Sequence, residues 1–183
     1  MKKWLIGSLV GAIIVFAWSF FSWTVSGFHD AEAKHLDTQD AIMQSLNENI
    51  KADGVYMLPS APPGSSMEQM EALGKQNAGK PWAIITYKTS YVNDMTRPMI
   101  RGFLINLVIV LLLISILMKG GAPDMKGAIV GSVIIGIIGF LWGPYMMHNW
   151  FQTPWEAMTG HMVEAVVPWA LCGAWLGWWL RRG

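Results

Sequence analysis

Four long stretches without a charged residue constrain this chain more than any other feature of its sequence. They cover residues 4–28, 102–118, 127–147 and 165–180. A helix rises about 1.5 Å per residue, so each stretch with its flanks reaches across a hydrocarbon core roughly 30 Å thick. Only 14% of the residues are charged, whereas soluble domains carry about 25%. The sequence therefore predicts four transmembrane helices, over residues 4–28, 99–118, 127–147 and 162–180.

The first apolar stretch differs from a cleaved signal peptide. Lys2 and Lys3 precede it, as in a signal sequence, but the apolar run covers 25 residues. The apolar region of a signal peptide has about 7–15 residues and ends in a small-residue cleavage site. We therefore expect an uncleaved signal anchor.

Basic residues in the short segments beside the apolar runs set the orientation. These residues are Lys2, Lys3, Lys119, Lys126, Arg181 and Arg182. With four spans they lie on one side of the membrane, and the positive-inside rule makes that side the cytoplasm. The prediction is a multi-pass protein of the bacterial inner (cytoplasmic) membrane, with both termini cytoplasmic and residues 29–98 periplasmic.

The long segment between the first and second spans is predicted to fold into a small cap at residues 29–98. Its expected elements are a helix over 30–49 that continues out of the first span, a strand over 54–59, a helix from a Ser65–Glu68 capping box to about Leu73, and a strand over 81–89. The two strands are expected to pair. The predicted fold class is therefore a membrane all-α, four-helix bundle with a small α+β extracytoplasmic cap. A cap of this size is marginal alone, so we expect it to need the membrane helices or a partner.

Glycine pairs spaced four apart occur in three of the spans. They are Gly7/Gly11, Gly127/Gly131, Gly139/Gly143 and Gly173/Gly177. Small residues at this spacing let membrane helices approach closely, although glycine is common in such helices in any case. The third span holds the most glycines and is predicted to form the centre of the bundle.

Three of the four histidines are predicted to lie at the outer membrane surface. His29 ends the first span, His148 ends the third, and His161 begins the fourth, with Glu164 one turn further on the same helix face. Imidazoles and a carboxylate that converge would bind Zn²⁺ or Cu²⁺, ligate a non-covalent haem, or carry protons. The alternative is that these are interfacial or packing histidines, because no metal-binding motif such as HExxH is present. The sequence leaves these interpretations open.

Glu164 needs a partner if it lies inside the membrane boundary, because ionisable groups there are costly. Arg101, at the outer end of the second span, is predicted at the same depth. We therefore expect a structural ion pair between Arg101 and Glu164.

Three segments carry a resemblance to a known group of proteins. They are Ser22-Trp23 with Phe28-His29 at the end of the first span, Gly54-Val-Tyr-Met-Leu-Pro59, and Pro81-Trp-Ala-Ile-Ile-Thr-Tyr87. In these segments the chain resembles uncharacterised bacterial four-helix inner-membrane proteins with a periplasmic insert. The resemblance implies the same topology and no particular activity.

Several function classes find no support in the sequence. Catalytic and nucleotide-binding motifs are absent, and a net charge of +1 offers no basic field for nucleic acid. We therefore expect a non-enzymatic accessory or scaffold subunit of a membrane assembly, or a homo-oligomer, whose partners are the lipid bilayer and other membrane subunits. The first alternative is a periplasm-facing metal or haem protein that uses His29, His148, His161 and Glu164. The second is a small transporter or channel, against which the spans hold few polar residues and no evident inverted repeat.

Overall fold

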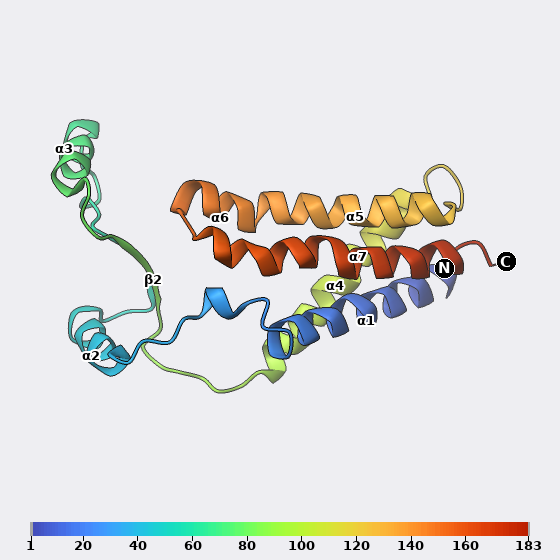
Figure 1. The fold of residues 1–183 in the computed structure, drawn as a ribbon, viewed down its shortest axis with the longest axis horizontal. Coiled ribbons are helices and arrows are strands. Elements are labelled where there is room, and N and C mark those ends of the chain that lie inside the picture. Colours follow the sequence, from blue (N-terminus) through green and yellow to red (C-terminus); the bar gives the residue numbers. More distant parts are fainter. Residues whose placement is uncertain (1, 183) are drawn as a thin grey trace. The chain divides into compact units, whose positions relative to one another are not determined.

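The computed structural model describes residues 2–182, which divide into two compact units (Figure 1). One unit joins the N-terminal segment up to Lys34 with the segment from Asp94 onward, and the other is His35–Asn93. Helices account for 69% of the chain, and the structure has one small two-stranded sheet.

The first unit contains all the long helices. Its elements are α1 (Lys2–Thr24), the 3₁₀ turn η1 (Asp30–Glu32), α4 (Thr96–Leu117), α5 (Met125–Trp142), α6 (Pro144–Phe151), the 3₁₀ turn η2 (Trp155–Ala157) and α7 (Met158–Trp179). Among residues 2–182, three helical segments are long and apolar enough to cross a membrane: Lys2–Thr24, Thr96–Gly120 and Met125–Phe151. The fourth predicted span falls on α7, which has 22 residues but includes Glu164, Pro168 and four tryptophans. These residues lower its mean hydropathy, and α7 is not among the three.

The prediction of a helix that continues out of the first span is wrong. α1 ends at Thr24, and the chain turns at Gly27, whose φ of +71° favours glycine. The Ser26 hydroxyl donates to the Ser22 carbonyl at 2.7 Å and helps to end the helix. Beyond this turn only η1 is helical until α2 begins at Gln39.

The third predicted span is interrupted near its end. α5 stops at Trp142, Gly143 leaves helical geometry, and Pro144 begins α6. Proline suits the first turn of a helix because the N–H that it lacks has no helical partner there. The expected boundary at residue 147 therefore lies within α6.

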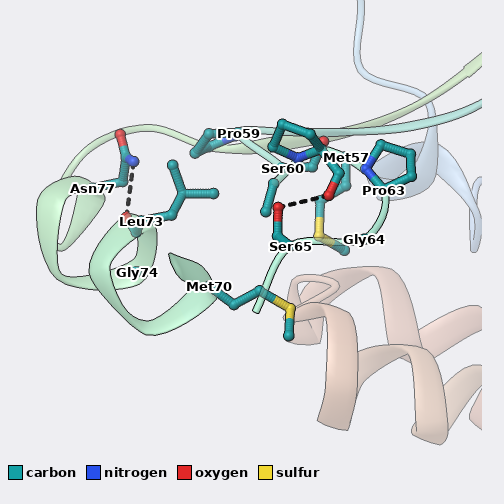
Figure 2. Close-up of a pocket in the computed structure, with 12 residues that line it drawn as sticks. Met57, Pro59, Ser60, Pro63, Gly64, Ser65, Met70, Leu73, Gly74 and Asn77 are labelled. Carbon is teal, nitrogen blue, oxygen red and sulfur yellow. Dashed lines mark hydrogen bonds between the residues drawn. The ribbon is translucent and has the colours of Figure 1, made fainter. Parts of the chain in front are cut away.

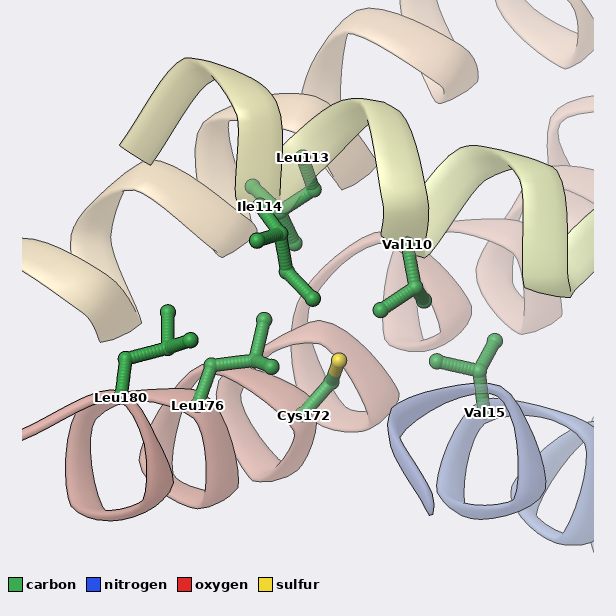
Figure 3. Packing of buried hydrophobic residues seen from close by; sticks show 7 residues of the cluster. All are labelled: Val15, Val110, Leu113, Ile114, Cys172, Leu176 and Leu180. Atoms are coloured by element: carbon green, nitrogen blue, oxygen red, sulfur yellow. The ribbon is translucent and has the colours of Figure 1, made fainter. Parts of the chain in front are cut away.

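The centre of the first unit is α7 rather than α5, so the prediction for the third span is wrong. α7 contacts both α5 and α1, while α4 packs on α1. It buries eight residues, whereas α5 buries three. Figure 3 shows the buried cluster from α1, α4 and the end of the chain, which consists of Val15, Val110, Leu113, Ile114, Cys172, Leu176 and Leu180.

Glycines allow α7 to lie close to α5. A Cβ added at Gly173 would lie 2.7 Å from Ile129 Cα and 2.8 Å from the Ala128 carbonyl oxygen, both backbone atoms of α5. Gly136 of α5 similarly has the Ala165 carbonyl of α7 against it. By contrast, a Cβ at Gly139 would meet no atom within 4 Å. Some of the glycines therefore permit the close approach of α5 and α7, and others take no part in it.

Two indoles join the C-terminal part of α7 to the beginning of α1. Trp175 Nε1 donates to the Gly7 carbonyl at 3.1 Å, and Trp179 Nε1 donates to the Lys3 carbonyl at 2.8 Å. Trp18 differs, because its buried Nε1 has no hydrogen-bond partner within residues 2–182. Buried indole N–H groups usually find an acceptor, and the first two do so across a helix–helix contact.

The second unit has the predicted order of helix, strand, helix and strand. Its elements are α2 (Gln39–Asn49), β1 (Gly54–Leu58), α3 (Met67–Asn77) and β2 (Ala83–Tyr87). The strands pair antiparallel, with Gly54 opposite Tyr87 and Leu58 opposite Ala83. The capping box uses Ser66 and Gln69, one residue later than predicted, and α3 continues past Gly74 to Asn77.

Asp53 fixes the end of this two-stranded ribbon. Its carboxylate accepts hydrogen bonds from Lys88 Nζ at 2.7 Å, from Thr89 N at 2.9 Å and from the Thr89 hydroxyl at 2.8 Å. These bonds, the one from Lys88 foremost, hold the pKa of Asp53 well below its usual range. The ribbon otherwise has little interior, since Tyr87 is the only buried residue of the unit.

Candidate functional site

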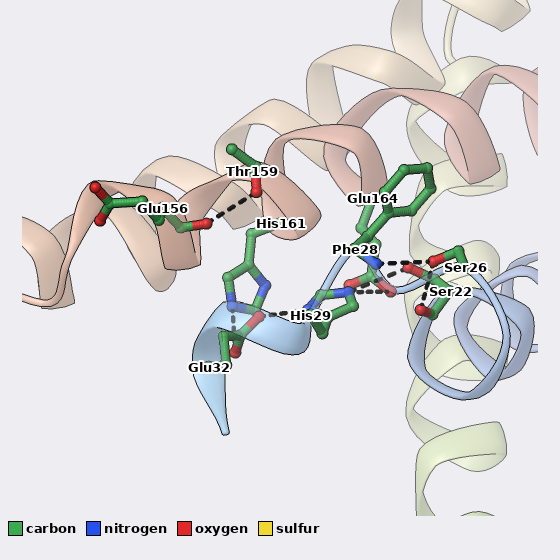
Figure 4. A network of polar contacts seen from close by, with 9 residues as sticks. All are labelled: Ser22, Ser26, Phe28, His29, Glu32, Glu156, Thr159, His161 and Glu164. Carbon is green, nitrogen blue, oxygen red and sulfur yellow. Dashed lines mark hydrogen bonds and ion pairs between the residues drawn. The ribbon is translucent and has the colours of Figure 1, made fainter. Parts of the chain in front are cut away.

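A cluster of polar side chains lies in the first unit where α1 ends, η1 follows and α7 begins (Figure 4). It consists of Ser22, His29, Glu32, His161 and Glu164. Ser22 is in the last turns of α1. His29 is the residue just before η1 and Glu32 is the last residue of η1, whereas His161 and Glu164 lie one turn apart on α7. Three separate segments of the chain therefore contribute to the site.

His29 occupies the middle of this cluster and is only 5% exposed. Its Nδ1 pairs with the Glu32 carboxylate. Its Nε2 lies 3.1 Å from the Ser22 hydroxyl and 3.5 Å from Glu164 Oε1. Both ring nitrogens thus face oxygen atoms, as a buried imidazole requires.

Glu32 connects the two histidines. While Oε1 pairs with His29, Oε2 lies 3.1 Å from His161 Nε2. The imidazole rings of His29 and His161 meet edge to face, with centroids 5.3 Å apart. One ligand atom from each of the three residues falls within 4.8 Å of the other two. The carboxylate therefore lies in a position from which it and both imidazoles can bind one ion.

Neighbouring residues fix the position of the His29 ring. The indole of Trp23 stacks on it, with centroids 3.9 Å apart and planes inclined by 8°. On the α7 side, a Cβ at Gly160 would lie 2.6 Å from His29 Cε1 and 2.8 Å from the Phe28 carbonyl oxygen. Glycine at position 160 thus permits the close approach that brings His29 to His161.

Glu164 lies at the boundary between the polar cluster and an apolar pocket. Its Oε1 is buried and has no hydrogen-bond partner among the described residues, although His29 Nε2 is 3.5 Å away. Glu164 and His161 also line a pocket of about 410 Å³, whose other walls are mostly apolar side chains such as Ile109, Ile138 and Trp169. A buried carboxylate oxygen facing an imidazole favours an N–H on that imidazole nitrogen.

The residues predicted from the sequence separate into two groups. His29, His161 and Glu164 come together, and Glu32 joins them. His148 in α6 instead pairs through Nδ1 with the Thr153 carbonyl at 2.7 Å and contacts the Trp155 ring.

The expected ion pair of Arg101 is not formed. No ion pair joins it to Glu164 within residues 2–182, and its side chain is exposed, whereas His29 provides the near partner of Glu164.

The sequence interpretation left Glu32 out of the site. Its signal was the His29-x-x-Glu32 spacing, which places the two side chains on one side of a helical turn. This spacing acts through η1, a 3₁₀ turn that follows a chain reversal. The sequence analysis expected a continuous helix over residues 30–49 and therefore did not predict such a turn.

Two imidazole nitrogens and a carboxylate are the donors that bind zinc and related divalent ions in proteins. Imidazole side chains in general also act as proton carriers. The geometry thus suits ion binding or proton transfer at the end of the helices.

The chain was compared with protein-family models, with curated proteins and with solved structures, and no match was found. The resemblance to bacterial four-helix membrane proteins therefore stays a prediction, and any statement on function depends on the residues themselves.

Proposed function

We propose that the chain is a four-span protein of the bacterial inner membrane that acts as a non-catalytic subunit of a larger membrane assembly or of a homo-oligomer. In this proposal both termini are cytoplasmic, and residues 29–98 form a periplasmic interaction cap.

Packing supports α7 as the fourth span. Its 22 residues give a helix of roughly 33 Å at 1.5 Å per residue. It contacts two of the three helices that are apolar enough to cross a membrane. A helix enclosed by other helices contacts less lipid and tolerates a lower mean hydropathy, because its polar residues face protein.

The observation that carries the subunit proposal is the lack of a core in the His35–Asn93 unit, in which only Tyr87 is buried. Large apolar side chains are exposed instead: Val55 is 71% exposed and Met67 78%. An isolated two-stranded ribbon is marginally stable in water, and exposed apolar groups of this kind mark contact surfaces. A partner that covers these apolar side chains would therefore stabilise the His35–Asn93 unit.

The unit also offers a hollow in which an apolar group would fit. A pocket of about 480 Å³ lies between α3 and the loop that follows β1. Figure 2 shows the residues that line it. Met57, Met70 and Leu73 line it together with the prolines of that loop. Methionine adapts its shape to a partner surface, which suits a contact site.

The test is the mass of the protein component after solubilisation in mild detergent, measured by light scattering. We expect a defined species heavier than one chain. The double substitution Val55→Thr with Met67→Gln keeps the side-chain size and removes apolar surface, so the species should dissociate. The matched control, Lys75→Gln with Lys80→Gln, changes exposed polar residues of the same unit and should leave the mass unchanged.

A wild-type mass equal to one chain in several mild detergents would contradict the proposal. Equal masses for both double variants would show that the exposed apolar residues are not the contact surface.

A further inference from the structure

We propose that His29, Glu32 and His161 bind a zinc ion, and that Glu164 and Ser22 position one of its ligands. This inference concerns the first unit and does not depend on the subunit proposal. The ligand set differs from the one expected from the sequence, because Glu32 replaces His148 and Glu164 moves from ligand to positioning residue.

The distances suit a single ion. Zinc binds imidazole nitrogen and carboxylate oxygen at about 2.0–2.2 Å, so that two ligand atoms at tetrahedral angles lie roughly 3.4 Å apart. One ligand atom from each of His29, Glu32 and His161 lies within 4.8 Å of the other two. His161 and Glu32 have partly exposed side chains, with 23% and 20% of their surface accessible. Small side-chain rotations therefore complete the site, and an ion reaches it from solvent.

A second observation, on the other nitrogen of His29, points independently to a metal. A histidine that binds a metal through one nitrogen usually donates the other N–H to a carboxylate or another oxygen, which fixes the ring orientation. His29 Nε2 lies 3.1 Å from the Ser22 hydroxyl and 3.5 Å from Glu164 Oε1, a buried oxygen without a hydrogen bond. Such an arrangement leaves Nδ1, on the Glu32 side, as the nitrogen available to the ion.

The donor set suits zinc better than it suits a haem. Two histidines and one glutamate form a known zinc ligand set that leaves a fourth position for water. A haem between the two imidazoles would need free space for its plane. Here the rings of His29 and His161 meet edge to face, with centroids 5.3 Å apart, and leave no such space.

The experiment is a zinc titration of the full chain in detergent after removal of metal by a chelator, with a competing indicator to measure Kd. The wild type should bind one Zn²⁺ per chain. His161→Ala and Glu32→Gln each remove a ligand and should weaken binding at least tenfold. Glu164→Gln leaves all three ligands in place and should weaken binding by about 10- to 100-fold, the usual effect of losing a ligand's supporting carboxylate.

The matched control is His148→Ala, which removes a histidine of the same unit that pairs with a backbone carbonyl instead. It should bind zinc like the wild type. Co²⁺ provides a second readout, because its visible absorption reports the ligand set. His161→Cys, which offers a thiolate in place of an imidazole, should keep Co²⁺ binding and add sulfur-to-metal charge transfer.

Thermal unfolding of each variant without metal distinguishes the loss of a ligand from misfolding. Each variant should unfold like the wild type. The proposal is overturned if the wild type shows no saturable zinc binding, or if His148→Ala weakens it as much as His161→Ala does.

Discussion

Replacing Gly173 by alanine tests whether the backbone contact between α5 and α7 holds the first unit together. The added Cβ would lie 2.7 Å from Ile129 Cα and 2.8 Å from the Ala128 carbonyl oxygen. Ordinary contact begins at 3.4 Å, so the nearer atom is about 0.7 Å too close. Both atoms belong to the α5 backbone and cannot rotate away, so the two helices must separate or bend.

The expected cost follows from this displacement. Forcing an extra methyl group into a packed interface costs about 1–3 kcal/mol. In addition, separation at Gly173 loosens the neighbouring contact of Gly177 with Met125 of α5. We therefore expect the free energy of unfolding to fall by about 1–3 kcal/mol, roughly a 5- to 150-fold change in the unfolding equilibrium.

The assay is reversible unfolding in mixed micelles of increasing SDS content, followed by far-UV circular dichroism. Gly139→Ala is the control, because it makes the same change on α5 at a position with no atom within 4 Å of the new Cβ. It should leave stability unchanged or raise it slightly, since alanine favours the helix. If the two variants unfold together, the α5–α7 contact is looser than described and the reasoning fails.

Three further perturbations act on other parts of the molecule. Gly160→Ala should lower zinc affinity without removing a ligand, because the new methyl group pushes His29 away from α7; zinc titration that finds wild-type affinity would contradict this. Trp179→Phe removes the N–H that donates to the Lys3 carbonyl and should cost about 0.5–1.5 kcal/mol of stability in the same SDS assay, whereas an unchanged midpoint would show that the bond contributes nothing. Asp53 should titrate below its ordinary pKa of 3.8 in carboxyl NMR. Its stabilisation of the ribbon is therefore complete above pH 3.8 and is lost as the pH falls through the lowered pKa. Asp53→Asn should remove this pH dependence of stability, and an Asp53 that titrates at the ordinary pKa would refute the hydrogen-bond explanation.

Charge-free runs and strand composition predicted much of the local structure. The ribbon of β1 and β2 was confirmed because β-branched and aromatic residues cluster in two short segments bounded by glycine and proline. The boundaries of α1 and α5 were less accurate, since Gly27 and Pro144 act through backbone geometry that hydropathy does not register. The backbone geometry at these turns therefore sets the helix boundaries, which composition alone did not predict.

The identity of the central helix was not predictable from glycine counts. α5 has more glycines, but α7 has the larger number of buried residues. Glycine marks where backbones approach, and one helix of a close pair can provide the small residues while the other has neighbours on more sides. α7 has such neighbours on two sides, because it contacts both α5 and α1.

Three of the five residues in the polar cluster followed from the sequence. Histidines at the ends of predicted spans indicated that His29 and His161 would share a level, and Glu164 followed from its helical spacing. Glu32 depended on a chain reversal at Gly27, and the pairing of His148 with Thr153 depended on a left-handed residue just after α6. Both features depend on local backbone geometry, which the periodicity of apolar residues does not predict.

The contact of α1 with α7 brings together residues 168 and 176 positions apart in the chain, through Trp175 with Gly7 and Trp179 with Lys3. During synthesis α1 leaves the ribosome long before either tryptophan has been translated. Its glycine-bearing face must therefore remain without its α7 partner until the last helix has been synthesised. A nascent chain arrested before α7 would be held as an unclosed bundle and would be exposed to quality-control proteolysis for the whole of that delay.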